Sequence, residues 1–209
     1  MRQLMGVWKW IVIAITTFAV CFIVFTSLWR PFHPALQGSV ILTLGMLVVF
    51  INYPISKSAL EKTHTDRKRI LITGTRNAPS LCDLAFSIIG SIPCIFIVIY
   101  WEPIVSNPLS YETYHLVLGA LLFIMLIEAT RRTLGKIVPV VVTFFVLYAF
   151  LGHLLPGEIG HAGYGLEELL YIFYLTTEGV WGLLTDLTSR LIAIFILLGP
   201  ILFACGVGS

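Results

Sequence analysis

Residues 120–139 read ALLFIMLIEATRRTLGKIVP, and this stretch decides the fold. Its apolar first part gives way to Glu128, Arg131, Arg132 and Lys136, and the chain then becomes apolar again. Charged side chains are costly in the middle of a bilayer and common at its surface, so a short charged island between two long apolar runs indicates a membrane boundary. We interpret the stretch as a polar junction between two membrane-spanning helices.

The whole chain has the composition of a membrane protein. Of its 209 residues, 58% are hydrophobic and only 11% are charged, and its mean hydropathy is +0.95. A bilayer core about 30 Å thick is crossed by roughly 20 mostly apolar helical residues. Six runs meet or nearly meet this requirement: 8–29, 38–54, 81–101, 114–130, 137–155 and 191–208. They are continuous and do not alternate in polarity, which favours helices over the strands of a barrel.

Residues 157–190 combine acidic and apolar side chains. Glu167, Glu168 and Glu178 are interleaved with Leu and Tyr and followed by Trp181, a mixture typical of a helix at the membrane surface. The alternative is a seventh full span, which would place Glu178 in lipid at a cost of a few kcal/mol. The sequence therefore predicts an all-α integral membrane protein with about six transmembrane helices and an interfacial or re-entrant helix near residues 166–186.

The basic residues are distributed asymmetrically along this topology. They flank the start of the first span, fill segment 57–76 and follow the fourth span, which places eleven of the thirteen on one side. Arg30 and Arg190 remain for the other side. The positive-inside rule then predicts a multi-pass protein with its N-terminus in the cytoplasm. Because these residues flank spans, the net charge of +2 does not indicate a nucleic-acid partner.

The polar junction contains the candidate structural residues Glu128, Arg131, Arg132, Gly135 and Pro139. Residues three and four apart share a helix face, so Glu128 is positioned to pair with both arginines. Two interpretations remain open. The group is either an ion-paired clamp that fixes a scaffold against a moving domain, or the basic residues are only topology anchors at a helix end.

Asp83 follows Pro79-Ser80 at the start of the third run. A carboxylate inside a membrane is costly and usually functional, so a role in proton coupling is one hypothesis. The hypothesis that we favour places Asp83 in the first helical turn, where a carboxylate complements the helix N-terminus.

The sequence offers no clear metal or catalytic centre. The four cysteines, Cys21, Cys82, Cys94 and Cys205, lack the spacing of metal ligands or redox pairs, and we expect free thiols. The five histidines fall in loops or at span ends, which disfavours paired haem ligands. We therefore predict no catalytic residue and no metal site, and we assign no substrate-binding residue.

Several motifs together resemble a known transporter family. The sequence EATRRTLG at 128–135 is followed by Pro139, by Tyr148-Ala149 and by Leu155-Pro156, then by LTTEG at 175–179 and FILLG at 195–199. In this order the pieces are similar to the N-terminal part of the fused permeases of tripartite ATP-independent periplasmic (TRAP) transporters, of the TAXI branch. Gly38 and His115 depart from the pattern, which usually has a basic and an acidic residue there.

The resemblance implies a sodium-coupled secondary transporter for organic acids in the cytoplasmic membrane of a bacterium or archaeon. Residues 1–130 would be a four-helix scaffold like the family's small subunit, and residues 131–209 the start of the large permease domain. The implied partners are a periplasmic TAXI-type binding protein, the remainder of the large subunit and the lipid bilayer. The family's sodium and substrate sites lie further along the chain, so the resemblance implies no cofactor and no enzymatic activity within these residues.

A membrane-embedded enzyme or redox subunit is the alternative function. It would require a nucleophile with a base, or opposed metal ligands, at membrane depth. The sequence presents neither pattern, whereas the chain ends within an apolar run, as expected for the front part of a longer permease.

Overall fold

The computed structural model describes residues 2, 4–29, 32–55, 77–107, 111–154, 156 and 160–206. Every regular element within these residues is helical, and six of the helices are long and apolar enough to cross a membrane. The predicted all-α membrane protein is thereby confirmed. Segment 57–76 and Arg30, which entered the orientation argument, lie outside the described residues.

The observed helices agree closely with the predicted runs. The six candidate spans are α1 (Val7–Leu28), α2 (Pro34–Asn52), α5 (Leu81–Ser106), α6 (Thr113–Leu134), α7 with its 3₁₀ extension (Ile137–Leu154), and the final helix Leu183–Ala204. The ends of the first five lie within a few residues of the expected positions. The last span differs, because it begins at Leu183 and not near residue 191.

Local sequence signals explain several of these helix ends. Pro34 occupies the first turn of α2, and the ring of His33 accepts from the backbone N–H of Ala35 (3.3 Å). Proline is favoured there because its missing N–H would have no helical partner. At the other end of the fold, α6 stops where Gly135 adopts a φ of 89°, a conformation that side chains other than glycine rarely tolerate.

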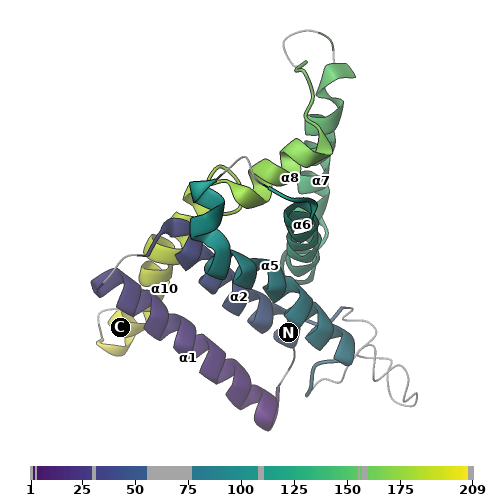
Figure 1. Ribbon diagram of the computed structural model, residues 1–209. Helices are drawn as coiled ribbons and strands as arrows, with labels where there is room; N and C mark the ends of the chain where they lie inside the picture. The colour runs from purple at the N-terminus through teal and green to yellow at the C-terminus, as the bar shows by residue number, and fades with distance from the viewer. Residues whose placement is uncertain are drawn as a thin grey trace, which may run out of the picture.

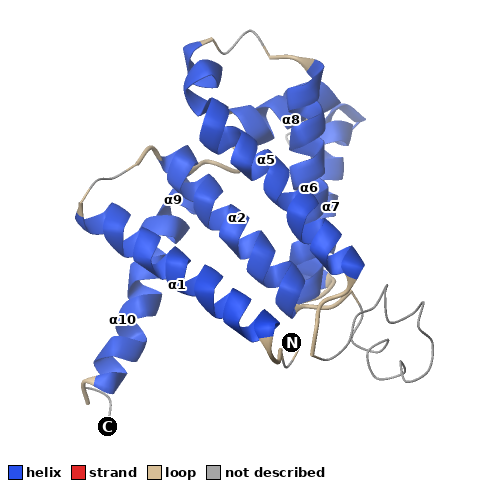
Figure 2. Ribbon diagram, turned by 60° about the horizontal axis from the view of Figure 1, so that its bottom comes forward, coloured by secondary structure: helices blue, strands red, loops and turns tan. Residues whose placement is uncertain are grey.

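The helices α1, α2, α5 and α6 form the body of the molecule. Figure 2 shows α1, α2 and α5 as diagonal rods lying side by side, with α6 and α7 beyond them. The most extensive packing is between α2 and α5. The core contains Phe50 from α2, Ile97 from α5 and Leu122 from α6, all fully buried. Close packing of such side chains stabilises the bundle through van der Waals contacts, because the surrounding lipid is as apolar as the core.

The region near residues 166–186 differs from a single helix. It contains α8 (Leu166–Leu175), a turn over 176–182, and α9 (Leu183–Leu187), which continues through a π-helix (Thr188–Ile192) into α10 (Ala193–Ala204). Ten residues are too few to cross a bilayer, so α8 is not a seventh span. In Figure 1 α8 lies across the top of the bundle, between the end of α5 and α7.

The helices α7 and α10 contribute no residue to this core. Pro139 is the one buried residue of α7, and every side chain described in α10 is exposed. Figure 2 shows α10 pointing away from the bundle. Because these helices are apolar, their exposed faces suit contact with lipid or with other membrane helices.

Candidate functional site

Asp83 is the centre of a buried group of charges at one end of the bundle, which we call the charged end. It occupies the first turn of α5, where its backbone N–H donates to Ser80 Oγ (3.0 Å) and its carboxylate accepts from Ser80 N–H (3.2 Å). This capping box provides partners for backbone groups that a helix N-terminus leaves unpaired. The expected position of Asp83 in the first helical turn is confirmed.

Two arginines close over the Asp83 carboxylate. Arg2 Nη2 lies 2.5 Å from Oδ2, and Arg132 Nη1 lies 2.6 Å from Oδ1. All three side chains are completely buried. A buried charge is stable only when it is paired and hydrogen-bonded, and both carboxylate oxygens meet that condition here. The N-terminus, α5 and α6 are therefore joined by one group of ion pairs.

The guanidinium groups also hold the end of α2. Three backbone carbonyls accept from them: Ile51 from Arg2 (3.1 Å), Tyr53 from Arg132 (3.1 Å) and Ile55 from Arg131 (3.3 Å). The last carbonyls of a helix lack helical partners and carry partial negative charge, so they attract cations. The rings of Phe50 and Phe86 lie 4.8 and 5.2 Å from the Arg132 guanidinium and add cation–π contacts.

Glu128 extends the group toward the surface. Its Oε1 accepts from Arg132 Nε (2.7 Å) and Arg131 Nη2 (2.8 Å), and its Oε2 accepts from Arg131 Nε (2.7 Å). The Glu128 side chain is 22% exposed, whereas that of Arg132 is completely buried. Every carboxylate oxygen of Asp83 and Glu128 thus faces a guanidinium group.

Gly135 and Pro139 have structural roles at the same end. Gly135 ends α6 in a left-handed conformation, directly after the turn that carries Arg131 and Arg132. Pro139 is buried in the first turn of α7, where a proline does not break the helix. These two residues set the direction in which the chain leaves the charged end.

The structure brings the predicted residues together and adds partners that sequence reasoning missed. Glu128 pairs with Arg131 and Arg132, as their spacing suggested, but Arg132 also reaches Asp83, and Arg2 does so from the opposite side. One signal was present in the sequence: a buried carboxylate requires a counter-charge, and three arginines were expected at the same membrane surface.

A second set of contacts anchors α8. The hydroxyl of Tyr174, which is completely buried, donates to the carbonyl of Pro93 near the middle of α5 (2.7 Å). Trp181 Nε1 donates in turn to the carbonyl of Tyr174 (2.6 Å). Gly119 of α6 allows this packing, because a Cβ atom there would lie 2.9 Å from the Tyr174 Cβ. The side chains of Tyr174 and Trp181 are therefore inserted into the bundle, whereas Thr177 and Glu178 between them are exposed.

The start of the last helix packs on α2 at the end opposite the charged end. Gln37, also buried, donates through Nε2 to the Ser189 carbonyl of the π-helix (3.3 Å). A Cβ on Gly38 would lie 2.7 Å from Thr185 Cγ2, so this close approach requires a glycine or a local shift.

Fold and site together define an all-α, multi-pass membrane protein whose helix ends are joined by buried ion pairs. In comparisons with known proteins, no family model, no curated protein and no solved structure matches the chain.

Proposed function

We propose that this chain is the scaffold part of a sodium-coupled, binding-protein-dependent secondary transporter for organic acids, of the TAXI-type TRAP class. In this proposal it lies in the cytoplasmic membrane with its charged end in the cytoplasm. It carries no reaction chemistry of its own. Its partners are a periplasmic binding protein and the moving part of the permease.

The buried ion-pair group of Arg2, Asp83 and Arg132 is the observation that carries the proposal. Removing one partner of a buried ion pair costs about 3–5 kcal/mol, so these contacts resist sliding between helices. They join the N-terminus to α2, α5 and α6. A transporter that moves one domain through the membrane needs a second domain that stays still, and a bundle locked in this way meets that need.

The outer helices support the same proposal. The faces of α7 and α10 are apolar and largely exposed, whereas α2, α5 and α6 bury their contact faces in the core. The chain thus combines a fixed bundle with helices that are free to contact further membrane segments. The order of the motifs at 128–139, 175–179 and 195–199 is what relates this arrangement to the TRAP permeases.

Transport by the reconstituted permease tests this function. The complete permease in proteoliposomes, supplied with its binding protein and a panel of radiolabelled carboxylates, should accumulate at least one acid only under an inward sodium gradient. Omitting the binding protein or dissipating the gradient should abolish uptake. Uptake that needs neither the binding protein nor the sodium gradient would contradict the proposal.

A further inference from the structure

A second region of interest lies at the end of the bundle opposite the charged end. Two adjoining pockets of about 250 and 530 Å³ share Tyr111 and Tyr171 in their walls. Small-molecule sites commonly occupy roughly 300–1,000 Å³. The two pockets adjoin at these tyrosines, between the end of α5, the start of α6 and α8, and we call the pair the cleft.

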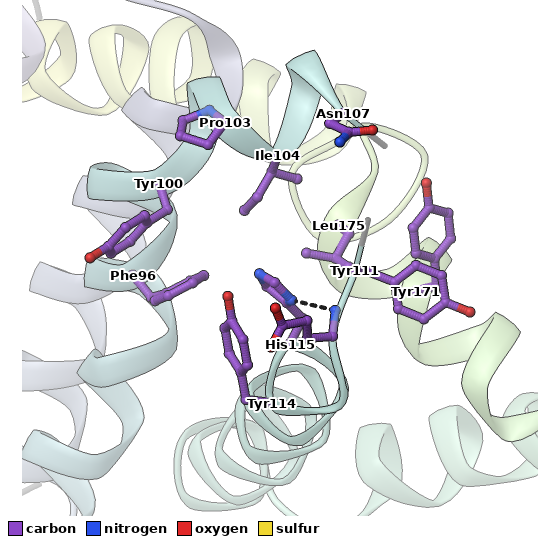
Figure 3. Close-up of a pocket in the computed structure, with 11 residues that line it drawn as sticks. Phe96, Tyr100, Pro103, Ile104, Asn107, Tyr111, Tyr114, His115, Tyr171 and Leu175 are labelled. Carbon is purple, nitrogen blue, oxygen red and sulfur yellow. Dashed lines mark hydrogen bonds between the residues drawn. The ribbon is translucent and has the colours of Figure 1, made fainter. Parts of the chain in front are cut away.

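Aromatic rings line the smaller pocket. Phe96 stacks on Tyr100 with ring centroids 4.7 Å apart, and Tyr114 meets the Phe96 ring edge-on at 5.9 Å. Tyr111 and Tyr171 contact each other at 5.0 Å on the other side. Figure 3 shows these rings arranged around a common space. Aromatic faces carry partial negative charge and attract ammonium and guanidinium groups.

Acidic residues provide the charge of the cleft. Glu112 lines the smaller pocket, and Glu167 and Glu168 line the larger one. The residues recorded in the two linings include no lysine or arginine. Carboxylates next to aromatic faces, without a basic neighbour, favour a positively charged ligand.

His115 is the polar group directed into this space. It is 7% exposed, and Figure 3 shows its ring inside the pocket with Nδ1 facing the backbone N–H of Glu112. Nδ1 accepts from that N–H (3.0 Å), so the neutral ring carries its proton on Nε2. Nε2 makes no hydrogen bond to any residue that the structure describes, and it is therefore available to donate to an acceptor oxygen in the cleft.

We propose that this cleft binds an organic cation: a guanidinium or ammonium group joined through a short stem to a carbonyl oxygen, as in an arginine or lysine residue. The aromatic rings and Glu112 hold the cation, and the acceptor oxygen lies against His115 Nε2. The cation comes either as a free basic compound or as a side chain of a docked polypeptide, and the two sources share this chemistry.

Binding to the full chain in lipid nanodiscs tests the proposal. N-acetyl-arginine methylamide is titrated by saturation-transfer NMR against N-acetyl-citrulline methylamide, which has nearly the same shape without the charge. We expect saturable binding of the arginine compound and at least about tenfold weaker binding of the citrulline compound. Equal binding of the two, or binding of neither, would overturn the proposal.

Matched variants locate the site. Glu112→Gln and Tyr114→Leu should each weaken binding of the arginine compound several-fold, because one removes a carboxylate and the other an aromatic face. Glu178→Gln, at an exposed position that is not part of either lining, should leave it unchanged. Thermal unfolding of each variant shows that it is folded. Equal affinity of Glu112→Gln, Tyr114→Leu and the unmodified chain would contradict this location.

A further arm distinguishes the two sources. The arginine compound is compared with the peptide Gly-Gly-Arg-Gly-Gly, whose additional backbone can contact the cleft. Tighter binding of the peptide indicates a polypeptide source, and equal affinity indicates a free compound. Because the readout is binding without transport, failure here leaves the scaffold proposal standing, and failure of sodium-driven uptake leaves the cleft intact as a site.

Discussion

At the scale of single residues, Asp83 determines how the charged end is built. Its carboxylate pairs with both Arg2 and Arg132, and it also caps α5 through Ser80. The same carboxylate thus caps its own helix and forms ion pairs with residues far away in the sequence. Among the described residues, the carboxylates of Asp83 and Glu128 balance the charge of the three guanidinium groups.

Asp83→Asn should therefore destabilise the protein strongly. The variant leaves two buried guanidinium groups facing a neutral amide, and breaking a buried pair in this way costs about 3–5 kcal/mol. Chemical or thermal unfolding in detergent measures the loss. Glu178→Gln, which neutralises an exposed carboxylate, serves as the control and should change stability little. Similar stability of the two variants would show that the Asp83 ion pairs contribute nothing.

Glu128→Gln should have a smaller effect on stability, of about 1 kcal/mol. Its side chain is 22% exposed, and an amide oxygen can still accept from one arginine. If the group acts as a clamp, the same variant also lowers assembly or sodium-driven uptake of the complete permease. Glu102→Gln, at an exposed position in α5, is the matched control. Unchanged assembly and uptake would contradict the clamp and favour the alternative, in which the arginines are only topology anchors.

At the scale of helices, α8 shows how a short element is anchored on an apolar bundle by its C-terminal end. The helix ends after ten residues. In the turn that follows, the backbone N–H of Val180 donates to the carbonyl of Phe173 (2.9 Å). Tyr174 and Trp181 then fill the core, with Gly119 providing the space. Small residues at such contacts let neighbouring elements approach closely in membrane proteins.

Gly119→Ala should loosen α8. The added Cβ would lie 2.9 Å from Tyr174 Cβ, so one helix has to shift. We expect a lower midpoint of thermal unfolding and faster amide hydrogen exchange in Leu166–Leu175. Gly45→Ala in α2 is the matched control, because no atom lies within 4 Å of its added Cβ. Faster exchange in both variants, or in neither, would contradict the proposed packing of α8.

The sequence predicted the spans well and the long-range contacts poorly. Continuous apolar runs fix the approximate bounds of the helices, and the spacing of Glu128, Arg131 and Arg132 is enough to predict their pairing. No local pattern places Arg2 against Asp83, because 81 residues separate them and the contact depends on how whole helices pack. The turn after Leu175 was also missed, although its close backbone contacts at Gly179 and Gly182 are with residues near in sequence, Ile172, Phe173 and Thr177.

At the scale of the whole molecule, the chain has two ends of different character. The charged end buries Arg2, Asp83 and Arg132, and the opposite end carries the tyrosine- and glutamate-lined cleft. The scaffold proposal places the charged end in the cytoplasm, as the distribution of basic residues predicts.

Labelling with a thiol reagent that cannot cross membranes tests this orientation. In a background with all four native cysteines replaced, Lys136→Cys and Ser106→Cys place single thiols at exposed positions near opposite ends of the bundle. On right-side-out vesicles Ser106→Cys should react at once, and Lys136→Cys only after permeabilisation. The reverse pattern would invert the topology and place the cleft in the cytoplasm.

The most direct test of the scaffold proposal is to identify the membrane partner of the chain in its own cells. An antibody against residues 57–76 captures the native polypeptide from solubilised membranes, and intact mass spectrometry measures what it carries. The account predicts that these residues are fused to, or stably associated with, a large permease part, in a species several-fold heavier than 23.3 kDa. A free 23.3 kDa polypeptide without a large membrane partner would contradict it.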